Sequence, residues 1–121
     1  MKPHIDKTGF GSITVSGKLY EHDIIIRLNG KVKKRKKKLS KEKYGTSHKI
    51  SFKEAEYIFE KGAEQLIIGT GQNGYVELSD EANRFFLENK CHVKQFPTPQ
   101  AIKEWNETKD SAVIGMFHIT C

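Results

Sequence analysis

The residues best suited to bind a ligand follow the apolar run Leu66-Ile67-Ile68, where the chain continues as Gly69-Thr70-Gly71-Gln72-Asn73-Gly74. The apolar run predicts a buried strand, and the glycines let the backbone turn tightly and approach a ligand closely. The N–H groups of this loop and the Thr70 hydroxyl are therefore candidate donors to an anion or a nucleotide phosphate. A tight turn without a ligand is the alternative. The spacing matches G-x-G-x-x-G, but the loop continues into Tyr75-Val76 instead of a helix, so the dinucleotide-binding motif is not indicated.

Other polar residues are expected to converge on this loop, because ligands of open α/β sheets bind at strand ends near a topological switch point. Asp23 precedes an apolar strand, either as a general base whose pKa is raised by burial or as a side chain that bonds nearby backbone. In the ending His118-Ile119-Thr120-Cys121, strand alternation puts the imidazole and Thr120 on one face and the thiol on the other, which argues against a Cys–His nucleophile. The predicted ligand-binding residues are Asp23, Gly69, Thr70, Gly71, Asn73, Thr98 and His118.

Neither a metal site nor a cofactor is predicted. The histidines at positions 4, 22, 48 and 92 lack ligand spacing such as H-x-x-x-H. Two cysteines, Cys91 and Cys121, are too few for a metal cluster. We expect two reduced thiols in a cytosolic protein, with a single bridge between them as the alternative. No residue pattern indicates a reaction, so no catalytic residue is assigned.

The net charge of +6 at pH 7 is concentrated in one segment. Lys31–Lys43 holds nine basic residues and one acid, Glu42, whereas the rest of the chain is slightly acidic. Such a run can neutralise the phosphates of a nucleic acid, although it offers no aromatic residue before Tyr44 for stacking on bases. A solvated face, or a lysine-rich edge strand that prevents sheets from associating, is the alternative. The predicted polyanion-binding residues are Lys33, Lys34, Arg35, Lys36, Lys37 and Lys38.

The first third of the chain has strand patterns. Residues 12–15 alternate polar and apolar side chains, and the isoleucine run within Asp23–Leu28 is typical of a strand covered on both faces. Asn29-Gly30 is a strong hairpin signal. The basic run is therefore predicted to begin as the return strand of a hairpin and to continue into a loop near Tyr44.

The rest of the chain alternates helices and strands. Ser51, Ser79 and Thr98 are predicted to be the N-caps of three helices. Strands are predicted at 66–68, 91–96 and 112–119, with a short extended piece at 75–78. This order predicts an α/β fold with α+β character, in which helices pack on a mixed central sheet. The length of 121 residues fits one domain, 1–121, with one core.

The chain is expected to be cytoplasmic. No stretch approaches the roughly 18 apolar residues of a membrane span. The polar start, Met1-Lys2-Pro3-His4-Ile5-Asp6, lacks the apolar core of a secretory signal.

Several fragments together resemble one known family. They are Phe10-Gly11-Ser12-Ile13 with Gly17, Tyr20 and Asp23; Ile68-Gly69-Thr70-Gly71; Pro97-Thr98 with Ala101 and Asn106; and His118-Ile119-Thr120-Cys121. The family is that of the mitochondrial complex I assembly factor 3 and the adipogenesis-associated cytosolic proteins, and the likeness is greatest to its stand-alone archaeal and other prokaryotic members of unknown function. The resemblance implies a three-layer β+α/β/α arrangement and brings no reaction. Many members carry a tryptophan after the hairpin, where this chain has Val32 and lysines.

Three hypotheses for function follow. The first is a small-molecule or anion-binding cleft beside Gly69-Thr70-Gly71, without an enzymatic reaction. The second is an adaptor that docks onto another protein. The third is non-specific binding of nucleic acid through Lys31–Lys43. A membrane partner is not predicted.

Overall fold

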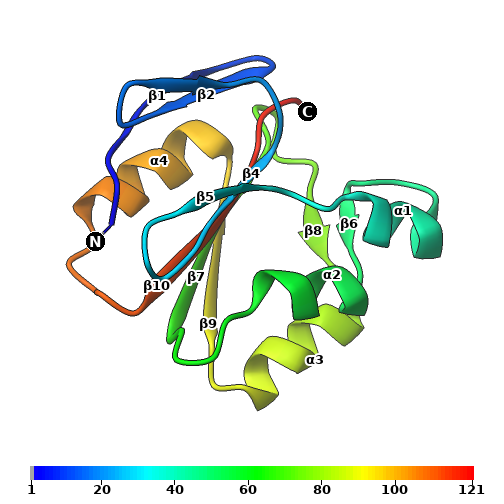
Figure 1. The fold of residues 1–121 in the computed structure, drawn as a ribbon. Coiled ribbons are helices and arrows are strands. Elements are labelled where there is room, and N and C mark those ends of the chain that lie inside the picture. Colours follow the sequence, from blue (N-terminus) through cyan, green and yellow to red (C-terminus); the bar gives the residue numbers. More distant parts are fainter. Residues whose placement is uncertain (1) are drawn as a thin grey trace.

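A computed structural model describes residues 2–121. A mixed five-stranded sheet crosses the middle of the molecule (Figure 1). β7 (Gln65–Thr70) pairs in parallel with β9 (His92–Phe96) and with β10 (Val113–His118). β4 (Ile24–Ile26) pairs antiparallel with β10 and with β5 (Val32–Lys34). The strand order is β5-β4-β10-β7-β9. The predicted hairpin at Asn29-Gly30 joins β4 to β5, and the three isoleucines of β4 are fully buried as expected.

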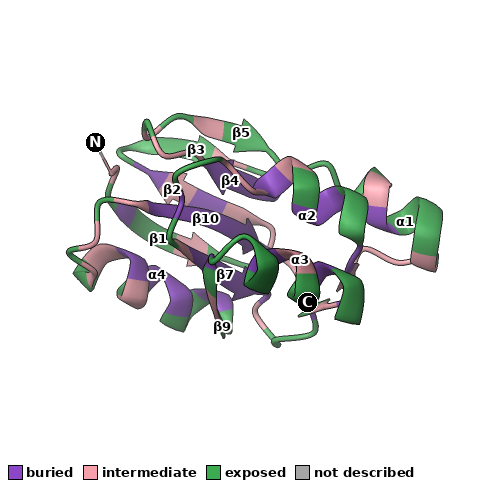
Figure 2. Ribbon diagram, turned by 90° about the horizontal axis from the view of Figure 1, so that it is seen from below, coloured by how far each residue is buried: buried purple, intermediate pink, exposed green. Residues whose placement is uncertain are grey.

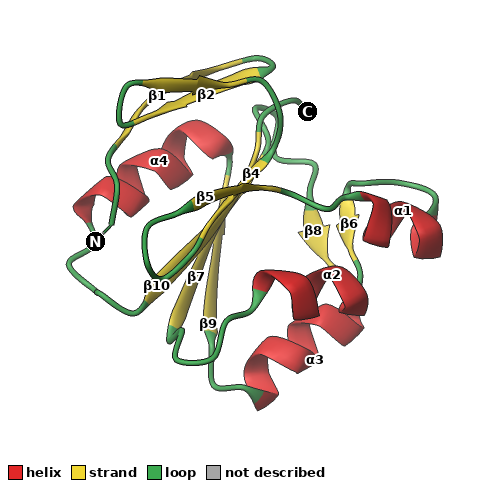
Figure 3. Ribbon diagram, viewed as in Figure 1, coloured by secondary structure: helices red, strands yellow, loops and turns green. Residues whose placement is uncertain are grey.

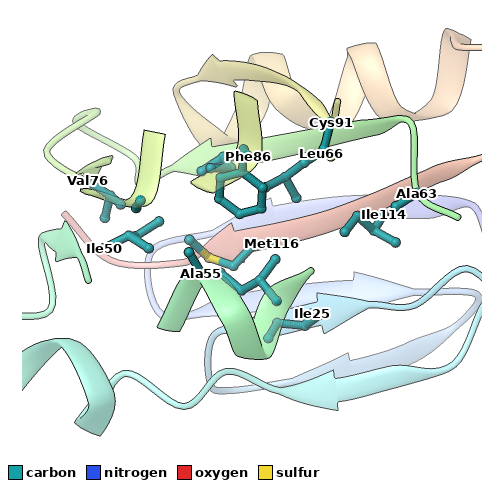
Figure 4. Packing of buried hydrophobic residues seen from close by; sticks show 13 residues of the cluster. Ile25, Ile50, Ala55, Ala63, Leu66, Val76, Phe86, Cys91, Ile114 and Met116 are labelled. Carbon is teal, nitrogen blue, oxygen red and sulfur yellow. The ribbon is translucent and has the colours of Figure 1, made fainter. Parts of the chain in front are cut away.

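One face of this sheet is covered by α2 (Phe52–Ile58) and α3 (Asp80–Glu88). Both helices begin at the predicted caps, because the Ser51 hydroxyl accepts from Glu54 N–H and the Ser79 hydroxyl accepts from Ala82 N–H. Their apolar side chains meet those of the strands in a continuous core (Figure 4). The labelled members are Ile25, Ile50, Ala55, Ala63, Leu66, Val76, Phe86, Cys91, Ile114 and Met116.

The opposite face is covered by α4 (Thr98–Glu107) and by a three-stranded antiparallel sheet (Figure 3). That sheet consists of β1 (Ile5–Gly9), β2 (Ser12–Val15) and β3 (Lys18–Tyr20). Trp105 and Phe117 pack edge to face at 5.9 Å within the second core. The helices turn exposed residues outward and the strands between them are mostly buried (Figure 2). The predicted three-layer arrangement around a mixed sheet is confirmed.

The details differ from the prediction at three places. The described residues contain four helices instead of three, because Lys38–Tyr44, predicted as loop, forms α1. Two unpredicted strands also occur, β1 and β6 (Lys49–Ile50), the latter pairing with β8 (Glu77–Leu78). Thr98 is the first residue of α4, and Pro97 occupies the cap position. None of the described helices is long and apolar enough to cross a bilayer.

Candidate functional site

The glycine loop after β7 packs against residues 120 and 121. Gly71 has a φ of +108°, and a Cβ at this position would overlap the carbonyl group of Cys121. The N–H group of Gln72 donates to the Thr120 carbonyl at 2.6 Å. Those of Asn73 and Tyr75 donate to the Cys121 carbonyl at 3.3 and 3.2 Å. Close backbone packing therefore accounts for glycine at position 71.

The hydroxyl groups near this loop also bond within the chain. Thr70 Oγ1 donates to the Phe96 carbonyl at 3.0 Å. Thr98 Oγ1 accepts from Gly71 N–H at 2.9 Å and donates to the His118 carbonyl at 2.6 Å. A Cβ on Gly69 would lie 2.9 Å from both the Phe117 and the Thr98 side chains. The prediction that these N–H groups and the Thr70 hydroxyl are available to an anion is wrong, because each already has a partner.

Asp23 and His118, two of the predicted site residues, meet at the neighbouring strand end. β4 is antiparallel to β10 with Ile24 opposite Phe117, so the residue before Ile24 lies next to His118. Asp23 Oδ2 accepts from His118 Nδ1 at 2.7 Å, and Asp23 Oδ1 accepts from Ile119 N–H at 2.9 Å. Asp23 is 4% exposed and His118 2% exposed. This carboxylate and imidazole therefore form a buried pair with one fixed geometry.

Arg35 joins this pair to a second carboxylate. Its Nη1 lies 2.9 Å from Asp23 Oδ2, and its Nε lies 2.5 Å from Glu54 Oε2. Its Nη2 donates to Glu54 Oε1 at 3.1 Å and to the Ser47 carbonyl at 2.7 Å. Ser40 Oγ also donates to Glu54 Oε1. All of these side chains are buried, so the network links the sheet, α1 and α2 through charged groups that water does not screen.

The charges in this network fix the ionisation of Asp23. Burial by itself raises the pKa of the Asp23 carboxyl, but the hydrogen bond and charge of His118, the N–H of Ile119 and the charge of Arg35 lower that pKa to about 2. Burial also opposes the charge on Arg35, yet Glu54 and Asp23 raise the pKa of the guanidinium above its usual value. The alternative in which Asp23 is a general base with a raised pKa is therefore wrong. Asp23 instead binds backbone, that of Ile119.

A pocket of about 190 Å³ lies beside the network, and we call it the Asp23 pocket. Asp23 and Arg35 are buried in its wall, Lys34 and Lys37 are exposed, and Thr120 is half-buried. Thr120 Oγ1 lies 3.1 Å from His118 Nε2, so the predicted placement of both residues on one face is confirmed. The full lining is Gly11, Glu21, His22, Asp23, Lys34, Arg35, Lys37, Ile119 and Thr120.

The basic segment forms β5, a connection and α1, which projects at the edge of the molecule (Figure 1). Its lysines are exposed at positions 33, 34, 36, 37 and 38. A broad hollow of about 680 Å³ lies among Lys34, Arg35, Lys36, Lys37, Lys38, Leu39, Lys41 and Glu42. Arg35 is the exception in the predicted polyanion-binding set. Its side chain has no exposed surface and is committed to Asp23 and Glu54, so that assignment is wrong for Arg35.

Neither cysteine is in a disulfide, as expected for two thiols. Cys91 is buried, which raises the pKa of its thiol to about 11, and Cys121 is half-buried. Among residues 2–121 no group of three or more His, Cys, Asp or Glu side chains is arranged to hold a metal ion.

The fold and the buried network thus define a small three-layer α/β domain with a basic-rimmed pocket at one end of its sheet. The chain belongs to the family described as protein of unknown function (DUF498/DUF598), which matches residues 5–118. Family membership agrees with the resemblance drawn from the sequence fragments.

Solved structures show the same architecture over almost the whole chain. A conserved hypothetical protein, PH1505 from Pyrococcus horikoshii OT3, is 32% identical with a TM-score of 0.90, over 97% of this chain and 98% of that one. A protein named MT938 is 33% identical with a TM-score of 0.83, over 99% and 100%. A protein from Bordetella parapertussis is 19% identical with a TM-score of 0.75, over 98% and 96%, a likeness of fold alone.

Sequence patterns did not identify Arg35 and Glu54 as partners. Glu54 fits the third position after the Ser51 cap, where a carboxylate ordinarily serves the helix start. Arg35 is embedded in lysines. The available signal was the residue type, since Arg35 is the only arginine in Lys31–Lys43 and a guanidinium suits a buried two-pronged ion pair far better than an ammonium group does.

Proposed function

We propose that this domain binds a small anionic ligand in the Asp23 pocket. The observation that supports this most is the lining of this pocket, in which exposed Lys34 and Lys37 and half-buried Thr120 occur together with the buried ion pair of Asp23 and Arg35. Buried charged groups at the wall of a concavity are typical of functional sites, because the desolvation of charged groups costs free energy that apolar residues would not cost.

The charges of the lining favour an anion as ligand. The carboxylate of Asp23 is already ion-paired with Arg35 and hydrogen-bonded to His118. The other carboxylate of the lining is that of exposed Glu21, which faces two lysines in the same lining, Lys34 and Lys37. Lys34 and Lys37 have no salt-bridge partner within 4.0 Å among residues 2–121. Two free ammonium groups and a hydroxyl are donors that suit phosphate or carboxylate oxygens.

The test is calorimetric titration with inorganic pyrophosphate. In the variant with both Lys34→Gln and Lys37→Gln, we expect affinity to fall at least about tenfold, since a hydrogen bond to a charged group contributes about 1.5–3 kcal/mol and 1.4 kcal/mol is tenfold. The matched control carries Lys41→Gln and Lys43→Gln, which remove the same charge from α1 but do not line this pocket. Equal affinities of the two double variants would contradict the pocket as the binding place.

A second candidate function is the binding of a nucleic acid across the basic segment. It is favoured by the five exposed lysines between positions 33 and 38 and by the broad hollow that four of them line, Lys34, Lys36, Lys37 and Lys38. Retention on single- or double-stranded DNA should then fall steeply with salt. Serine at Lys33, Lys34, Lys36, Lys37 and Lys38, with Arg35 left intact, should abolish retention. A wild-type protein that is not retained at low salt would refute this candidate.

A further inference from the structure

We propose that Thr120 is an acyl acceptor, activated by His118 and supported by Asp23, and that the Asp23 pocket takes small acyl phosphates. The proposal rests on the proposed function, because the same lysines would hold the phosphate of the substrate. It adds a covalent step that anion binding alone does not include.

Three side chains stand in the order hydroxyl, imidazole, carboxylate. Thr120 Oγ1 is 3.1 Å from His118 Nε2, and His118 Nδ1 is 2.7 Å from Asp23 Oδ2. A nucleophile within hydrogen-bond reach of a base, with a third group orienting the base, is the arrangement that activates hydroxyl groups in covalent catalysis. The Asp23 carboxylate is itself held by Arg35 Nη1 and by the Ile119 N–H, both at 2.9 Å.

The contact with Asp23 fixes which nitrogen carries the hydrogen when the imidazole is neutral. An ionised carboxylate only accepts, so His118 Nδ1 carries the hydrogen that points to Asp23. In the neutral form of the ring Nε2 carries no hydrogen, and it can then accept the proton of the Thr120 hydroxyl, whose oxygen lies 3.1 Å away. Arg35 Nη1 lies 3.5 Å from Nδ1, but both atoms carry hydrogens, so neither accepts from the other. The imidazole is therefore set to accept the hydroxyl proton.

The Thr120 hydroxyl is more accessible from the pocket than the His118 imidazole, as an acyl acceptor requires. His118 is almost fully buried and does not line the pocket, whereas Thr120 is half-buried and does. The hydroxyl is therefore the member of the three that meets a ligand. Lys34 and Lys37 supply positive charge for the phosphate and for the oxygen that becomes negative during attack.

The step balances without an oxidant or a reductant. Thr120 Oγ1 attacks the acyl carbon, and its proton passes to His118 Nε2. The bond between the acyl carbon and the bridging oxygen breaks, and phosphate leaves with the electron pair and takes the proton from His118. The product is an acyl ester of Thr120. Water then hydrolyses this ester to the carboxylic acid and restores the hydroxyl.

The probe is acetyl phosphate, with phosphate release and acetylation both measured. Trypsin cleaves after Lys109, so the peptide 110–121 has no lysine to react and carries Ser111 as an exposed hydroxyl for comparison. General-base assistance contributes about 10²–10⁴-fold. We expect either acetyl-Thr120 roughly 100-fold above acetyl-Ser111, or phosphate release above the spontaneous rate. Thr120→Val should remove the signal, whereas Thr120→Ser and Cys121→Ser should keep it.

Two outcomes would overturn the proposal. In the first, the wild type neither acetylates Thr120 above Ser111 nor speeds phosphate release. In the second, Thr120→Val behaves as the wild type does. The pyrophosphate titration separates this failure from that of the proposed function, since a protein that binds pyrophosphate without transferring acetyl refutes only the covalent step. Thr120 is half-buried, and an amide NMR spectrum of Thr120→Val shows whether the fold is kept.

Discussion

Replacing Arg35 by methionine tests whether the buried network holds the basic segment to the sheet. The guanidinium is the ion-pair partner of two carboxylates that have almost no exposed surface, Asp23 and Glu54. Removing one member of a buried ion pair costs about 3–5 kcal/mol, because the remaining charge is left without a partner. Domains have total stabilities of about 5–15 kcal/mol, so Arg35→Met should remove a large share of the free energy of unfolding.

The assay is urea denaturation at neutral pH followed by the fluorescence of Trp105, the only tryptophan and fully buried. Lys38→Met is the matched control, since it removes the same charge from an exposed position and should change stability by no more than about 0.5 kcal/mol. Arg35→Lys keeps the charge but loses the two-pronged geometry, and should fall between them. If Arg35→Met unfolds within about 1 kcal/mol of the wild type, the network does not stabilise the fold as described.

Three further outcomes are expected. The pKa of Asp23 is held at about 2, below its ordinary 3.8, so its contribution of about 2 kcal/mol to the free energy of unfolding is present at neutral pH and is lost as pH falls from 3.8 to about 2. Asp23→Asn should therefore reduce the loss of stability, measured by urea denaturation, over this pH range. An unchanged pH dependence in the variant would contradict this. Gly71→Ala should lower the free energy of unfolding by at least about 2 kcal/mol, because the cost of a left-handed φ and the cost of the overlap with Cys121 are both incurred. Gly45→Ala, which has the left-handed φ but open space around it, should lower it by only about 1 kcal/mol in the same urea denaturation. With a thiol reagent near neutral pH, half-buried Cys121 should react first and buried Cys91 only on unfolding; equal rates would contradict the packing of Cys91.

The elements with strong local signals were predictable from the sequence. The isoleucine run of β4, the Asn29-Gly30 turn and the serine caps of α2 and α3 each depend on neighbouring residues, and each was found where it was predicted. α1 was not predictable, because its lysines give no apolar periodicity. Ser40, bonded to Ser51 and Glu54, attaches it to the domain, and those contacts are tertiary.

The candidate site was predictable only in part, for the same reason. Asp23 and His118 were selected as polar residues at strand ends, and the antiparallel pairing of β4 with β10 brings them together. The glycine loop could not be interpreted correctly from the sequence, because glycine allows close approach of a ligand and of another backbone segment equally well. Here the neighbour is the Thr120 and Cys121 backbone, a contact between residues about fifty positions apart that no local pattern reveals.

The measurement that tests the binding proposal most directly is a two-dimensional amide NMR titration with inorganic pyrophosphate. We predict saturable shifts of the Gly11, Ile119 and Thr120 amides, which line the Asp23 pocket from two distant parts of the chain. Shifts confined to the lysines of α1, with those three amides unchanged, would contradict a ligand site in this pocket.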